Sequence, residues 1–229
     1  MPIDIETEGI GTINEIVRTL FGESSQTVDI VILLTILTLL PSILMMLTGF
    51  TRIIIVLSFI RQALGMQQTP PNQILIGLGL FLTFFVMQPV FSMVYEDAYV
   101  PFTEGRITQE EFIENAMEPT RTFMLEQAFP SDLNFFIGMA GEEYPDIETI
   151  PNSVLIPAFI TSEIKHAMFI GFIIYIPFIV IDMIVASTLM SMGMMMLPPA
   201  MISLPFKVLL FVMVDGWQLI IGSLVNTFY

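Results

Sequence analysis

Long apolar runs interrupted by short polar turns set the pattern of the amino-terminal half. Residues 30–51 carry no charge, a shorter apolar run over 53–60 extends them, and a second long run covers residues 74–95. A helix that crosses a bilayer needs about 20 apolar residues, so each long run is long enough. Residues 67–72 contain Pro-Pro, which stops a helix. The pattern therefore predicts a first helical hairpin over residues 30–95.

The carboxyl-terminal half holds a still longer apolar stretch. Residues 167–206 carry a single charge, on Asp182. This stretch is about twice as long as one bilayer-crossing helix. The chain must therefore turn back within it, and a cluster of methionines that stops at Pro198 and Pro199 marks the place. We predict a second helical hairpin over residues 161–229 with a methionine-rich loop.

An acidic polar block, residues 96–160, separates the two halves. Thr108 and Glu111 have the spacing of a helix capping box, and an apolar helix face follows until Pro119. A second helix is expected to begin at Pro119 and a third after Ser131. The block is thus predicted to be a small helical insertion.

Aromatic residues in the third of these helices are candidates for contacts with another subunit. About fifty residues cannot bury much core alone. Phe135 and Phe136 are therefore expected to contact a neighbouring subunit. Packing back onto the membrane helices is the alternative.

The basic residues predict an orientation. Arg52 and Arg61 flank the turn of the first hairpin, and basic loops stay in the cytoplasm. The acidic segment 1–29, which lacks the basic region of a secretory signal peptide, and the block 96–160 are then expected outside. The expected fold class is an all-α membrane protein with about four long hydrophobic helices in two kinked hairpins and a small helical extracytoplasmic insertion.

Composition supports this class and argues against several functions. Hydrophobic residues make up 55% of the chain and charged residues 13%, against roughly 25% charged residues in soluble domains. The net charge is −15, and the seven basic residues form no cluster, so no nucleic-acid partner is expected. The absence of cysteine excludes disulfides, thiolate metal ligands and thiol catalysis.

Charged residues interrupt the carboxyl-terminal half and need partners. A charge at the centre of a lipid-facing helix costs about 2.5 to 3.5 kcal/mol on insertion scales. A single chain with four helices offers little interior for such groups, so we expect an oligomer whose interfaces bury them. The charged residues concerned are Glu163, Lys165, Asp182, Lys207 and Asp215.

Several motifs resemble a known family. They are Met-Gly-Met-Met-Met-Leu-Pro-Pro at 192–199, Leu-Pro-Phe-Lys at 204–207, Val-Asp-Gly-Trp-Gln-Leu at 214–219, Arg-Gln-Ala-Leu-Gly at 61–65 and Gln-Thr-Pro-Pro-Asn at 68–72. In these motifs the chain resembles the FliP family of flagellar biosynthetic proteins, and the resemblance extends over residues 33–229.

The resemblance implies a core channel subunit of the bacterial flagellar type III protein export gate. In that family several copies assemble helically with FliQ and FliR in the cytoplasmic membrane at the flagellar basal body, around a channel for unfolded flagellar subunits. The helices build a raised, partly extramembrane cone. The equivalent subunit of a virulence injectisome stays open as an alternative. An ion or solute transporter would predict an inverted repeat, and the two halves of the sequence do not show one.

The resemblance assigns Met194, Met195 and Met196 to a loop that forms a gasket in the channel. Methionine suits this task because its unbranched side chain is flexible. Core filling by methionine is the alternative for an arbitrary protein. Coordination of Cu(I) would need soft ligands and often a nearby histidine, but His166 is alone and distant in sequence, so no metal or cofactor is expected.

Glu163 and Lys207 are expected, by the same resemblance, to form an ion pair between subunits. Each lies beside apolar sequence and needs a counter-charge. The alternative is that Glu163 pairs with Lys165 or His166, or reaches water at a membrane boundary.

Asp182 and Asp215 could suggest an intramembrane aspartyl protease with two carboxylates sharing a proton. Neither residue lies in a Gly-x-Gly-Asp loop, so both are predicted to be buried structural residues at a helix interface. The sequence contains no phosphate-binding loop or nucleophile triad. We therefore expect no catalysis.

Overall fold

The computed structural model describes residues 31, 34–35, 38–39, 42–43, 45–66, 68–142, 144–194 and 196–229. Every regular element among these residues is helical. In chain order the elements are α3 (Phe50–Ala63), α4 (Asn72–Val86), α5 (Gln88–Val94), the π-helical turn η1 (Tyr95–Tyr99), α6 (Val100–Thr103), α7 (Gln109–Gln127), α8 (Pro130–Ala140), the 3-10 turn η2 (Ile147–Thr149), α9 (Asn152–Ser191), α10 (Pro199–Met213) and α11 (Gly216–Val225). The acidic segment 1–29 and part of the first predicted run lie outside the described residues.

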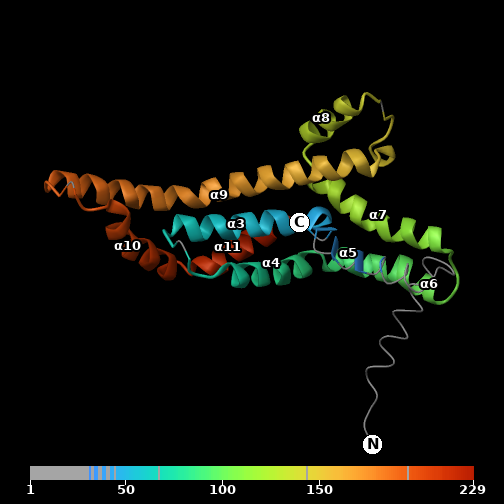
Figure 1. Ribbon diagram of the computed structural model, residues 1–229, viewed down its shortest axis with the longest axis horizontal. Helices are drawn as coiled ribbons and strands as arrows, with labels where there is room; N and C mark the ends of the chain where they lie inside the picture. The colour runs from blue at the N-terminus through green and yellow to red at the C-terminus, as the bar shows by residue number, and fades with distance from the viewer. Residues whose placement is uncertain are drawn as a thin grey trace, which may run out of the picture.

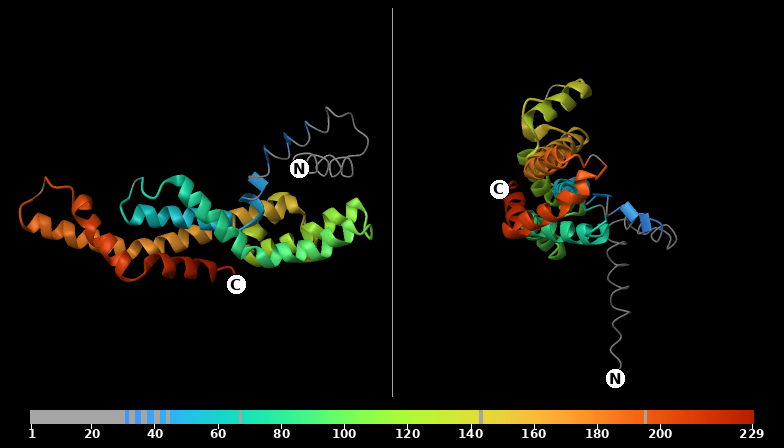
Figure 2. Two further views of the ribbon diagram at one scale, coloured as in Figure 1. Left: turned by 90° about the horizontal axis from the view of Figure 1, so that it is seen from below. Right: turned by 90° about the vertical axis from the view of Figure 1, so that its left-hand side faces the viewer.

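The molecule is elongated, and α9 runs along most of its length (Figure 1). Helices α3, α4 and α11 lie along one side of α9, α10 folds back at one end, and α5 to α7 form the other end (Figure 1). Helix α8 lies on the opposite side of α9 from α4 and α11, as the second view in Figure 2 also shows. The acidic insertion and the methionine-rich loop are therefore at opposite ends of the long axis.

Helix α9 has 40 residues, which correspond to about 60 Å at 1.5 Å per residue. This is about twice the thickness of the bilayer hydrocarbon core. Pro157 and Pro177 lie inside the helix without ending it. The predicted boundary at residue 160 falls within α9, so the acidic insertion and the second hairpin share one helix.

Among the described residues, α9 is the one unbroken helix that is long and apolar enough to cross a membrane. The other candidates are bent pairs: α4 with the helical segment 88–103, bent by 58°, and α10 with α11, bent by 65°. Pro89 explains the first bend, because it cannot donate a hydrogen bond to the preceding turn. Among the described residues, the structure thus has one unbroken candidate span and two bent ones, and it does not confirm about four long hydrophobic helices, the first of which lies partly outside those residues.

Helix α7 corrects the prediction of two short helices in the acidic insertion. The capping box of Thr108 and Glu111 is confirmed, with Thr108 accepting from the Glu111 amide and the Glu111 carboxylate accepting from the Thr108 amide at 2.7 Å. The predicted break at Pro119 is wrong, because α7 continues through this buried residue to Gln127. A proline removes one backbone donor, and here the surrounding packing holds the helix together.

The core lies between α3 and the first half of α9. Four α3 residues spaced three and four apart have no exposed surface: Ile53, Val56, Leu57 and Ile60. They belong to one cluster with the fully buried α9 residues Leu155, Ala158 and Phe159. The first half of α9 is therefore held by packing within the chain, whereas the more apolar second half is mostly exposed on this chain.

Candidate functional site

A buried ion pair joins α3 to α9. The Arg52 Nε donates to Glu163 Oε2 at 3.1 Å, and the Arg52 Nη2 donates to Glu163 Oε1, so the contact is bidentate. Both side chains are 0% exposed. A planar guanidinium suits this geometry because its donors form a fixed fork that matches a carboxylate.

The remaining donors of Arg52 bind two other parts of the chain. Nη1 donates to the carbonyl oxygen of Thr227 at 3.0 Å and to its hydroxyl at 3.1 Å, and Nη2 donates to Gln127 Oε1 at 3.0 Å. All five N–H groups of the guanidinium thus have acceptors. Burial of this charge is tolerable because its hydrogen bonds are complete.

A second ion pair joins α9 to α10. The Lys207 Nζ donates to Asp182 Oδ2 at 2.6 Å, and the Ser203 hydroxyl donates to Asp182 Oδ1 at 2.5 Å. Lys207 and Ser203 lie one helical turn apart on the buried face of α10. Asp182 is therefore satisfied within the chain.

These two pairs change the interpretation of Glu163 and Lys207. The structure gives each side chain a different partner within the same chain, Arg52 and Asp182 respectively. The expected counter-charge of each residue is therefore present within the chain, so these charges do not by themselves require an oligomer. Among the described residues, every buried side-chain nitrogen and oxygen has a hydrogen-bond partner. A Glu163–Lys207 contact between subunits stays a prediction that one chain does not test.

A third polar cluster fixes α8 on α9. Asp132, which is 3% exposed, accepts from the Ser162 hydroxyl at 2.8 Å and from the Lys165 ammonium group. The Phe129 amide donates to Ser162 Oγ at 2.9 Å, and the Phe129 ring stacks on His166. Lys165 and His166, the alternative partners of Glu163, are thus used to hold α8.

The predicted subunit-contact residues lie on α8. Phe135 is 61% exposed, whereas Phe136 is half-buried and packs against the core cluster. The two rings meet edge to face. The structure therefore leaves Phe135 free to contact another molecule and gives Phe136 the alternative role of packing back onto its own chain.

The methionine-rich loop forms one end of the molecule (Figure 1). Gly193 has a φ of +76°, a left-handed conformation that lets the chain leave α9 and turn. Met196 is 98% exposed and Met194 is 42% exposed, while Met195 lies outside the described residues. The exposure of the two described residues argues against core filling by these side chains in this chain.

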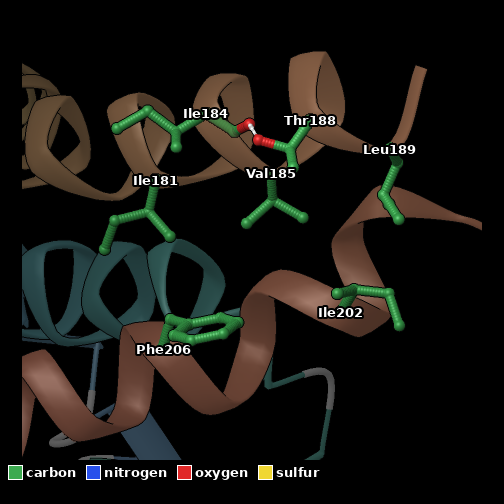
Figure 3. A pocket seen from close by; sticks show the side chains of 7 residues that line it. All are labelled: Ile181, Ile184, Val185, Thr188, Leu189, Ile202 and Phe206. Carbon is green, nitrogen blue, oxygen red and sulfur yellow. Dashed lines mark hydrogen bonds between the residues drawn. The ribbon is translucent and has the colours of Figure 1, made fainter. Parts of the chain in front are cut away.

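An apolar pocket of about 440 Å³ lies next to this loop, between α9 and α10. Figure 3 shows its lining, formed by Ile181, Ile184, Val185, Thr188, Leu189, Ile202 and Phe206. The one hydroxyl among them, on Thr188, donates to the backbone oxygen of Ile184 at 2.8 Å. The lining therefore offers no free polar group for chemistry.

Asp182 and Asp215 have different environments. Asp182 binds Lys207 and Ser203, whereas Asp215 lies exposed in the turn between α10 and α11 with a φ of 50°. The predicted burial of Asp215 is thus not provided by this chain alone, because a tight left-handed turn places it on the surface. An acid that binds a lysine and a serine is not arranged to share a proton with a second acid. Among the described residues, no group of three or more His, Asp or Glu side chains is placed to hold a metal ion.

The sequence did not identify Arg52 or Asp132 as site residues. The positive-inside rule treats Arg52 as a residue that flanks the first turn, although a lone arginine between two apolar runs also signals a buried, paired charge. Asp132 was counted with the acidic block, where nothing distinguishes it in sequence. Its role depends on Ser162 and Lys165, about thirty residues further along the chain.

Comparisons with a family profile and with individual proteins point to the same family. Residues 33–224 match the sequence profile of the FliP family. The chain is 57% identical over 206 residues to the flagellar biosynthetic protein FliP of Pectobacterium carotovorum subsp. carotovorum, covering 89% of this chain and 79% of the relative. It is 52% identical over 205 residues to the protein of the same name from Bacillus subtilis, covering 89% and 93% of the two chains. A relative from Buchnera aphidicola subsp. Baizongia pistaciae is 51% identical over 203 residues, and the chain spans 56% of its length. This chain, whose described part is all helical with a long apolar helix and a methionine-rich turn, belongs to the FliP family.

Proposed function

We propose that this chain is a channel subunit of the flagellar protein export gate in the bacterial cytoplasmic membrane, required for flagellum biogenesis. The observation that carries the proposal is the match to the FliP family over residues 33–224, with relatives named flagellar biosynthetic protein at 50–57% identity in several bacteria. These names favour the flagellar system over a virulence injectisome. The cargo would be unfolded flagellar subunits.

Exposed apolar surface supports assembly with other subunits and with lipid. Large apolar side chains are exposed along α4, α9, α10 and α11, including Phe81, Phe169 and Met213. On α8, outside the candidate spans, Phe135 and Met139 are also exposed. Such surfaces mark interaction sites in folded proteins. Further copies of this chain, together with FliQ and FliR, are the partners that the family resemblance implies.

The acidic insertion is proposed to face outside the cytoplasm. Thirteen acidic and two basic residues occur between residues 96 and 148, and external loops are depleted in basic residues. Arg52 contributes little to the orientation, because it is buried in an ion pair. Arg61 stays near the turn, where it donates to the Pro70 carbonyl oxygen and to Asn72 Oδ1.

A gene deletion in the bacterium that carries this chain tests the function. Deletion should abolish swimming and the secretion of flagellar subunits, and a plasmid-borne copy should restore both. The protein should be recovered in the inner membrane with the other export proteins. Normal flagellar secretion in the deletion strain would contradict the proposal, and loss of injectisome secretion with intact flagella would favour the alternative.

Ion leak through the purified gate tests the gasket. Replacing Met194, Met195 and Met196 together by alanine should raise conductance, because shorter side chains cannot close the channel. The matched control replaces three exposed methionines elsewhere, Met168, Met183 and Met213. Equal conductance of the loop variant and the wild type would count against the gasket.

A further inference from the structure

We propose that residues 227–229, which follow α11 and are called the strap below, lock the bent α10–α11 segment to the acidic insertion so that the two move as one body. The strap contacts the start of α3, the end of α4 and the end of α7. These elements come from three separate parts of the sequence. The inference rests on contacts within the chain and does not depend on the proposed function.

The backbone of the strap carries the first set of contacts. The Thr227 carbonyl and hydroxyl oxygens accept from Arg52, and the Phe228 carbonyl oxygen accepts from Gln127 Nε2 at 3.2 Å. Gln127, the last residue of α7, also accepts from Arg52 through Oε1. The strap is therefore a direct ligand of the guanidinium that binds Glu163.

The Phe228 ring closes over the buried charge. It is 6% exposed, the Arg52 guanidinium carbon lies 4.0 Å from its centroid, and it stacks on Phe123 of α7 at 6.3 Å. Gly49 makes room for the ring, because a Cβ atom at this position would lie 2.4 Å from Phe228 Cε1. A guanidinium over an aromatic face is attracted to it, most strongly where water is excluded.

The Tyr229 side chain carries the third contact. Its hydroxyl donates to the backbone oxygen of Val86 at 3.0 Å, at the bend between α4 and α5. This carbonyl lies where Pro89 interrupts the regular helix bonding. The strap thus also ties the bent segment that leads into the acidic insertion.

Helix α11 has few other anchors. Of its ten residues, three are buried: Gly216, Ile220 and Leu224. Without the strap, Arg52 would lose two acceptors and its aromatic cover, and α11 would keep only this short apolar stripe. Because α10 begins directly after the methionine-rich loop, the strap connects the bent α10–α11 segment that follows this loop to the helices of the opposite end.

Distance measurement between two spin labels tests the proposal directly. The chain contains no cysteine, so labels at Ile113→Cys on α7 and Met213→Cys on α10, both exposed positions, are specific. In the full chain in lipid nanodiscs, the expected distance distribution is narrow. Phe228→Ala should widen it, and the matched control Phe172→Ala, an exposed aromatic on α9, should leave it unchanged.

Two milder variants keep the test decisive if Phe228→Ala folds poorly. Tyr229→Phe removes one hydroxyl, and Gly49→Ala forces the Phe228 ring from its seat. Widening in at least one of them supports the strap. An unchanged distribution in all three variants would overturn it, and so would widening in Phe228→Ala alone, since that result indicates a general loss of packing.

Discussion

Arg52 and Glu163, 111 residues apart in the sequence, form a bidentate ion pair with no exposed surface. The pair lies where α3, α7 and α9 meet. Removing two charges from water is expensive, and the complete set of hydrogen bonds around Arg52 offsets that penalty. The pair therefore fixes how α3 sits on α9 and adds little to net stability by itself.

Breaking one side of this pair should be strongly destabilising. Arg52→Met leaves the Glu163 carboxylate buried without its partner, so we expect a loss of about 3–5 kcal/mol in the free energy of unfolding. Denaturant titration of the purified chain in detergent, followed by circular dichroism, measures this loss. A cost near that of breaking an exposed ion pair, such as Arg106→Met, would contradict the prediction.

Double variants identify the true partner of Glu163. Arg52→Met combined with Glu163→Leu should recover part of the loss, because no unpaired charge stays buried. Combining Glu163→Lys with Lys207→Glu in the single chain should lower the free energy of unfolding by about the sum of the two single losses. If that exchange restores stability or gate assembly, the pair between subunits is correct and the intrachain pair is secondary.

Close helix approach at Gly171 gives a second prediction. A Cβ atom at Gly171 would lie 2.5 Å from Phe59 Cδ2 and 2.6 Å from Cγ, so the Phe59 side chain of α3 must shift. Overpacking of this kind costs about 1–3 kcal/mol, and Gly171→Ala should lower the free energy of unfolding by that amount. Phe59→Leu in the same chain should recover part of it.

Gly222 is the matched control for Gly171. It is also helical, but nothing lies within 4 Å of the position of its Cβ. Gly222→Ala should stabilise α11 by up to about 1 kcal/mol, because alanine loses less backbone entropy than glycine. Equal effects at both positions would show that helix propensity, not contact with Phe59, decides the outcome.

Local signals explain which parts of the fold the sequence predicted. The capping box at Thr108, the turn before Asn72 and the turn after the methionines depend on residues close in sequence, and the structure has all three. The continuity of α7 through Pro119 depends on packing from distant elements, which a local rule does not contain. The proline at position 89 is a sequence signal for the bend. The apolar run 74–95 is nevertheless long enough to predict one continuous helix.

The sequence predicts that the candidate site contains paired charges, but it does not predict which residues form the pairs. Apolar sequence around Glu163 and Lys207 indicated that each needs a counter-charge, and both have one. The identities of the partners, Arg52 and Asp182, depend on how α3 and α10 fold onto α9. With several charged residues available, the sequence alone allows many pairings, and tertiary structure selects among them.

The capping box of α7 should respond to pH. Hydrogen bonds from the Thr108 backbone and hydroxyl hold the pKa of the Glu111 carboxyl below its ordinary value of 4.5. A lowered pKa in the folded state means that this contribution to stability is complete above the ordinary value and is lost as the pH falls through the lowered one. The difference in the free energy of unfolding between wild type and Glu111→Gln should therefore be present at neutral pH and should disappear in acid.

The control for this prediction is Glu114→Gln on the same helix, which removes a carboxylate and leaves the capping box intact. Thr108→Ala should reduce stability by about 1 kcal/mol at neutral pH through loss of the cap. Unfolding curves across the acid range measure all three variants. A Glu111→Gln difference that persists far below the ordinary pKa would contradict the assignment.

Substitutions of Asp215 test whether this residue is needed for its backbone conformation or for its charge. Asp215 has φ 50° and ψ 49°, and the next residue, Gly216, packs so closely on Phe211 that a Cβ atom there would lie 2.4 Å from the ring. The left-handed conformation costs an L-residue roughly 1–2 kcal/mol, and β-branched side chains tolerate it least. Asp215→Val should therefore destabilise the chain, Asp215→Gly should be at least as stable as wild type, and Asp215→Asn should be nearly neutral in unfolding experiments. If Asp215→Gly and Asp215→Asn are stable but abolish export, the carboxylate has a role beyond the turn. If both keep export, the left-handed backbone alone explains why an aspartate is suited to this position.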